Sequence, residues 1–192
     1  MNLESLRRNK VGVAVGVVVL LAVAGGAYLA FADQDPVKIS NAEELQNMNN
    51  NLDADYVLVD DIDASEIENF EPIGSRSEPF TGTFDGAGHT ISGLAIARDS
   101  SNFVGLFGVI AADGEVRDVT LAAVSVDGGS ETGSLAGESA GVVTGVTVSG
   151  SVPGANQVGG LVGSVGPNGT VSASSATGTV AIPRPYTSAP KT

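Results

Sequence analysis

The sequence has no cysteine and no tryptophan, and its 22 acidic residues outnumber its nine basic ones. Without cysteine, the chain can form neither disulfides nor thiolate metal sites. The formal net charge of -13 excludes a nucleic-acid groove, because phosphate recognition needs clustered Lys and Arg. All acids except Glu4 lie between Asp33 and Glu138, so residues 139–192 carry none.

Several catalytic patterns are also missing. No H-E-x-x-H, G-x-G-x-x-G or Walker sequence occurs, so the signatures of zinc peptidases and phosphate-binding loops are absent. The only histidine, His89, follows a tight glycine turn, where a turn-capping histidine is commoner than a catalytic one. Residues 108–185 contain no aromatic ring, so a glycan site of stacked rings is not expected there. We predict no catalytic residue and no cofactor.

An apolar segment follows three basic residues at the N-terminus. Residues 11–32 carry no charge, and about 20 apolar residues suffice for a helix to cross a bilayer. Ala30-Phe31-Ala32 also fits a signal-peptidase site. Residues 1–32 are therefore interpreted as an uncleaved membrane anchor or a cleaved signal peptide, helical in either case. The positive-inside rule then places the rest at the cell surface or outside the cell, with a membrane contact through 11–32 if they are uncleaved.

Residues 33–100 begin with a helix signal and continue with strand signals. SNAEELQNMNNNL, residues 40–52, predicts a short capping helix with Asn41 as N-cap and Glu44 three residues later. DADYVLVDDID alternates apolar and polar residues as a strand does. Turn-rich β-type runs follow. We interpret 33–100 as an N-terminal cap with the first rungs of a coil.

Residues 101–182 repeat with a period of about 27 residues, which is typical of stacked repeat architectures. VGLFG, TGSLAG and VGGLVG mark three copies, and a Gly-x-Val follows each. Units rich in Gly, Val, Thr and Ser favour short strands over helices. Coiling them gives a parallel β-solenoid with rungs about 4.8 Å apart. The predicted ladders of inward side chains are Leu106, Leu135 and Leu161; Val116, Val143 and Val171; and Leu121, Val148 and Ala176.

NQVGGLVGSVGPNGTVSASSATGTV, residues 156–180, resembles the GLUG motif of bacterial and archaeal surface proteins, adhesins and non-catalytic parts of secreted peptidases. The match is looser over 101–150, where Ser134-Leu135-Ala136 departs from the Gly-Leu-x-Gly core. The motif's usual asparagine is replaced by Asp118, Gly145 and Ala173. The resemblance implies a right-handed β-helix and surface placement, and it carries no catalytic residues.

The predicted fold class is therefore all-β: a right-handed parallel β-helix with a short N-terminal capping helix and an N-terminal transmembrane or signal helix. Three prolines in the tail 183–192 cannot extend a strand ladder, so they end the coil. The last rung, residues 157–182, is then either covered by the tail or available for self-association, since it lacks the acids that would repel a second copy.

Two classes of function remain open. The first is a non-catalytic structural or adhesive surface module with a protein or glycan partner. The second is a small polysaccharide lyase-like enzyme that uses Asp60, Asp61 and Asp63. Asp61 and Asp63 share a strand face and are candidates for calcium, which takes six to eight oxygens. The alternative is that these acids only face solvent. Asn168 begins an Asn-Gly-Thr sequon and is a candidate glycosylation site.

Overall fold

The computed structural model describes residues 18–23, 26–31 and 35–181. The chain divides into two compact units, Met1–Pro36 and Val37–Thr192. The first contains the predicted leader, and the second contains the whole of the predicted coil. The predicted tail 183–192 lies outside the described residues.

The described part of the leader is a β-hairpin, so the helix predicted for it is wrong. Strands β1 (Val18–Val23) and β2 (Gly26–Phe31) pair antiparallel, from Val18 opposite Phe31 to Val23 opposite Gly26. β-Branched valines favour strands, and glycine weakens a helix. Within the described ranges, no helix has the length and apolarity needed to cross a bilayer. The role of residues 11–32 as an anchor or signal stays a prediction.

A short helical segment opens the second unit. Strand β3 (Val37–Ile39) leads into α1 (Ala42–Gln46) and the 3₁₀ helix η2 (Asn47–Asn50). The Asn41 side chain caps α1 by accepting the Glu44 N–H at 2.9 Å. The Glu44 carboxylate accepts the backbone N–H and the hydroxyl of Ser40 at 2.8 and 2.9 Å, and these bonds lower the pKa of Glu44. Leu45 and Met48 are buried in the core, so this segment packs on the apolar interior, and its role as a cap stays a prediction.

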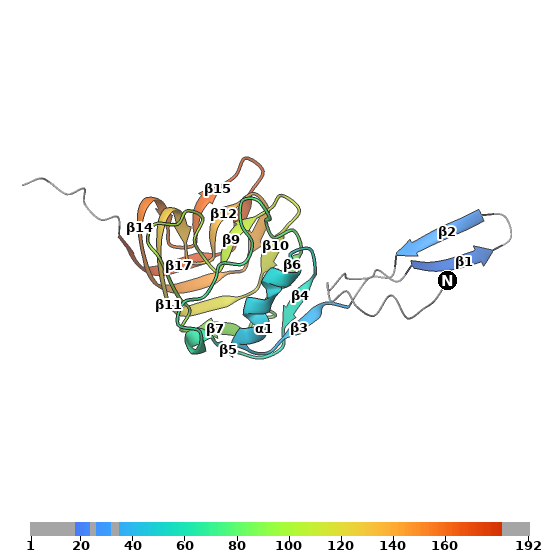
Figure 1. Cartoon of the computed structure of the whole chain (residues 1–192), viewed down its shortest axis with the longest axis horizontal. Helices are drawn as coiled ribbons and strands as arrows, with labels where there is room; N and C mark the ends of the chain where they lie inside the picture. The colour runs from blue at the N-terminus through green and yellow to red at the C-terminus, as the bar shows by residue number, and fades with distance from the viewer. Residues whose placement is uncertain (1–17, 24–25, 32–34, 182–192) are drawn as a thin grey trace, which may run out of the picture. The chain divides into compact units, whose positions relative to one another are not determined.

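Three parallel sheets form the coil (Figure 1). The first contains β3, β4 (Tyr56–Leu58), β6 (Thr83–Asp85), β10 (Glu115–Arg117), β13 (Val142–Thr144) and β16 (Thr170–Ser172). The second contains β5 (Ile62–Asp63), β7 (Thr90–Ser92), β8 (Ala95–Arg98), β11 (Thr120–Gly133), β14 (Thr147–Gly159) and β17 (Ser175–Ala181). The third contains β9 (Phe107–Ile110), β12 (Ala136–Ser139) and β15 (Val162–Val165). The 3₁₀ helix η3 (Ala64–Glu66) lies outside these sheets and follows β5. The predicted parallel β-solenoid is thus confirmed, and its right-handedness stays a prediction.

The interior becomes less aromatic along the coil. In the first sheet the stacked inward positions are Tyr56, Phe84, Val116, Val143 and Val171. The rings of Phe80 and Phe107 lie 5.0 Å apart between centroids, and those of Phe84 and Phe107 lie 5.6 Å apart. Aromatic side chains therefore fill the interior of the early turns, and smaller side chains fill the interior of the later turns.

The corner after each later strand of the first sheet has left-handed backbone. Asp118, Gly145 and Ala173 have φ of 51°, 65° and 47°. These are the positions at which the resembled motif carries asparagine. Asparagine and glycine adopt this conformation more easily than other residues, so the corner geometry gives a physical reason for that residue and shows that Asp and Ala can take its place.

Candidate functional site

Of the three carboxylates considered for catalysis, Asp60 is exposed, whereas Asp61 and Asp63, which were also the calcium candidates, bond to the chain itself. The Asp61 carboxylate accepts the Thr90 N–H at 2.8 Å and lies 3.2 Å from Nδ1 of His89. The Asp63 carboxylate accepts the hydroxyl and the N–H of Ser65 at 2.6 and 3.0 Å and so caps η3. No group of three or more His, Cys, Asp or Glu side chains in the described chain is arranged to hold a metal ion.

The same hydrogen bonds lower the pKa values of the Asp61 and Asp63 carboxyls. The hydrogen bond from the Thr90 N–H is the main cause that lowers the pKa of Asp61, and the hydrogen bond with His89 is the second. The Ser65 hydroxyl and N–H lower the pKa of Asp63. A general acid needs a carboxyl that holds its proton near the working pH, so its pKa must be raised. These two carboxyls are shifted the other way, and both stabilise turns.

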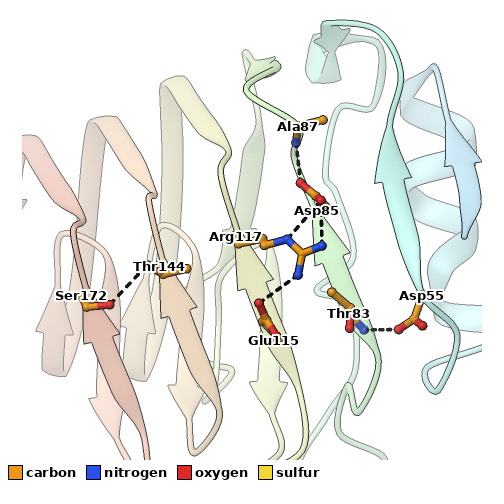
Figure 2. Close-up of polar contacts among 8 residues, drawn as sticks. All are labelled: Asp55, Thr83, Asp85, Ala87, Glu115, Arg117, Thr144 and Ser172. Carbon is orange, nitrogen blue, oxygen red and sulfur yellow. Dashed lines mark hydrogen bonds and ion pairs between the residues drawn. The ribbon is translucent and has the colours of Figure 1, made fainter.

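A polar row runs along the outer face of the first sheet (Figure 2). Nε and Nη2 of Arg117 donate to Oδ2 of Asp85 at 3.0 and 2.9 Å, and Nη1 donates to Glu115 at 3.0 Å. Asp85 comes first among the causes that raise the pKa of Arg117, and Glu115 second. One turn earlier, the Asp55 carboxylate accepts the Thr83 N–H at 2.8 Å. Side-chain bonds thus tie successive turns together here.

Farther along this face, hydroxyls replace the charges. Thr144 and Ser172 occupy the register positions after Arg117, and the Ser172 hydroxyl donates to Oγ1 of Thr144 at 3.2 Å. Sequence reasoning did not find this row, because Asp85 and Arg117 are far apart in sequence. The repeat spacing was the signal that could have placed them in adjacent turns.

The predicted ladder residues occupy stacked positions. Val116, Val143 and Val171 are direct register partners. The third predicted ladder is also in register, with Leu121 beside Val148 and Val148 beside Ala176.

Leucines line an adjacent corner of the coil. The N–H of Leu106 donates to Ser134 O at 3.1 Å, and that of Leu135 donates to Leu161 O at 2.9 Å. Leu106 and Leu135 are fully buried, whereas Leu161 is only partly buried.

Burial is lost at the last described rung. Val165, Val171 and Val180 are 50%, 39% and 48% exposed. β15, β16 and β17 are the terminal strands of their sheets, each paired on one side among the described residues. Residues 139–181 contain no charged side chain. This end therefore presents backbone edges and apolar side chains without charge.

The candidate glycosylation site lies at the surface. Asn168 is exposed in the turn between β15 and β16. An exposed turn gives a transferase access to the side chain, and modification of Asn168 stays a prediction.

Comparisons with known proteins place similar sequences in larger chains. The chain is 42% identical to halomucin of Haloquadratum walsbyi over 157 residues, which cover 74% of this chain and 2% of halomucin. It is 36% identical to a Gly-rich membrane protein of Evansella cellulosilytica over 125 residues, or 60% of this chain and 14% of that protein. The chain thus spans only a small part of either relative.

Two further comparisons complete this picture. A crystal structure of a candidate immunoglobulin A1 protease from Bacteroides ovatus has a TM-score of 0.47 and 18% identity, over 77% of this chain and 68% of that one. No family model matches the chain. The chain is therefore similar to segments of a halomucin and of a Gly-rich membrane protein, and it folds as a parallel β-solenoid.

Proposed function

We propose that this chain is a non-catalytic surface module, structural or adhesive, that holds a stiff β-solenoid outside the cell. The observation that carries the proposal is the parallel pairing from β3 to β17, in which the strands of each turn of the coil pair with those of the next turn. The names of the two relatives, a halomucin and a membrane protein, support a surface location.

The chemistry of the carboxylate corner supports a non-catalytic role. Asp61 and Asp63 stabilise local turns, and their pKa values are lowered, which suits permanently charged hydrogen-bond acceptors.

Surface labelling and an activity screen test the two parts of this proposal. Antibody against the coil should label intact cells, and labelling that requires permeabilised cells would contradict the surface location. The purified chain should leave acidic polysaccharides intact with and without calcium. Depolymerisation that disappears when Asp60, Asp61 and Asp63 are replaced by Asn would establish the enzyme instead.

The leader is tested by the form of the protein that cells produce. An anchored chain should stay with the membrane fraction and keep its N-terminal residues. Mature protein that begins at Asp33 in the medium would reject the anchor and support a cleaved signal.

We further propose that the last rung, residues 157–182, is a contact surface for a second copy. Within residues 35–181, its strands are paired on one side only and its valines are exposed. It also lacks the charge that keeps a chain of net charge -13 apart from its copies elsewhere. Sedimentation should show association that increases with concentration. Deletion of residues 183–192 should strengthen it if the tail competes for this surface, and monomers at high concentration in both forms would refute the proposal.

A further inference from the structure

An open cleft of about 400 Å³ lies beside the early turns, away from the carboxylate corner and the last rung. It collects segments that are distant in sequence, from the end of η2, from residues 71–78 and from residues 98–104. The side chains that matter most are Arg76, Arg98, Asn102, Phe103, Glu71 and Glu78. Sequence reasoning missed this cleft, because no motif joins its residues.

Arg98 is the unusual member of the cleft. Its Nε is buried and has no hydrogen-bond partner, and among the described residues its guanidinium forms no ion pair or hydrogen bond. Buried polar atoms in native proteins are nearly always paired, so each exception calls for an explanation. A guanidinium has five donors arranged for planar acceptors. Because Nε of Arg98 is itself buried, a ligand carboxylate in the cleft would pair with the other donors of this guanidinium.

Arg76 lies in the same cleft and is only loosely engaged. Its guanidinium is centred 4.8 Å from the ring of Phe103, and its Nη1 is 3.7 Å from a Glu138 oxygen. The Arg76 side chain is 68% exposed. Residues 35–181 contain three arginines, and only Arg117 is held by short bonds to two carboxylates. The other two line one cleft of a strongly acidic chain.

The remaining groups define the rest of the ligand. Asn102 uses its carbonyl oxygen to accept the Ser130 N–H at 3.1 Å, which leaves its amide N–H groups as donors. Glu71 and Glu78 also line the cleft, and a carboxylate can accept hydrogen bonds from ligand hydroxyls. Arginine forks bind carboxylates in a bidentate manner. The set therefore matches a small molecule with one carboxylate and several hydroxyls.

We propose that this cleft binds an acidic sugar unit of the uronic acid type. Arg98 pairs with the sugar carboxylate, Arg76 assists from above Phe103, and Glu71 and Glu78 accept sugar hydroxyls. An acidic peptide would offer the carboxylate without the hydroxyls, so Glu71 and Glu78 would gain no hydroxyl donor to offset their repulsion of its charge. This inference rests on the adhesive role proposed above and names the class of ligand. Binding of a uronate to the cleft can be measured whether or not the chain reaches the cell surface.

Calorimetric titration of the full-length chain tests this assignment with glucuronate, an oligouronate, glucose and a triaspartate peptide. We expect glucuronate and the oligouronate to bind, with affinity that falls as NaCl rises, and glucose and triaspartate to bind at least tenfold more weakly. Arg98→Gln should weaken glucuronate binding at least tenfold. Arg98→Lys keeps the charge but loses the fork, so it should weaken binding less.

Arg117→Gln is the matched control, because it removes the same charge outside the cleft. It should leave glucuronate binding within twofold of the parent chain. Equal losses from Arg98→Gln and Arg117→Gln would reduce the effect to net charge and overturn the site. Triaspartate binding as tight as glucuronate binding would overturn the sugar assignment, and no binding by either uronate would overturn the proposal. Far-UV circular dichroism and the thermal midpoint of each variant establish that it is folded.

Discussion

Truncation of one leucine in the middle of the coil should destabilise it far more than the same truncation one turn later. Leu135 is fully buried, and its backbone bonds to the turns on both sides: its N–H to Leu161 O, and its carbonyl to the Phe107 N–H at 2.7 Å. Leu135→Ala keeps these bonds and removes only side-chain volume. Buried Leu→Ala changes cost roughly 3–5 kcal/mol when the cavity cannot collapse. The side chain of Leu135 packs in the fully buried core, so we expect a loss of about 3 kcal/mol.

Leu161→Ala is the matched comparison, because Leu161 follows Leu135 in the ladder and is only partly buried. Its side chain buries less apolar area on folding, so its truncation should lower the free energy of unfolding by about 1 kcal/mol or less. Urea unfolding of the full-length chain in mild detergent, followed by far-UV circular dichroism, measures both free energies of unfolding. Equal losses for the two variants would refute the reasoning, since they would show that the last rung is packed as well as the middle of the coil.

Three other predictions concern turns and charges. Gly141→Ala should lower the free energy of unfolding by at least about 2 kcal/mol, because an added Cβ would meet the carbonyl oxygens of the preceding turn. Gly166→Ala should cost less in the same unfolding assay, because the nearest atom to its Cβ would be a side-chain carbon at 3.1 Å. Ala173→Asn should raise the free energy of unfolding by about 0.5–1 kcal/mol, since asparagine tolerates left-handed backbone better; a loss in urea unfolding would contradict this. The pKa values of Asp61 and Asp63 are lowered by folding, so their stabilisation is complete above about pH 4 and is lost as the pH falls through their lower folded values. The thermal midpoint should drop over that range, and less steeply when both are replaced by Asn.

The repeated elements were the most predictable part of this protein. Val116, Val143 and Val171 recur with the period of the chain, and the structure places them in register. Asn41 and Glu44 marked the start of the helix, and their hydrogen bond is present. Both signals are local or periodic, so the residues that produce the structure stand at readable spacings. The helix predicted for the leader was wrong, because an apolar run is compatible with a buried helix or a strand pair and its valines favour the strands.

The sequence by itself determined the parallel coil, because a repeat of Gly, Val, Thr and Ser at one period leaves stacking as the way to bury its apolar positions. Only the tertiary structure decided which polar side chains meet. It brought Asp85 to Arg117 across one turn and gathered Arg76, Arg98 and Phe103 around one cleft. Such contacts depend on the lengths and paths of the irregular early turns, where pairing and loop shape, and not the repeat, set the distances between residues.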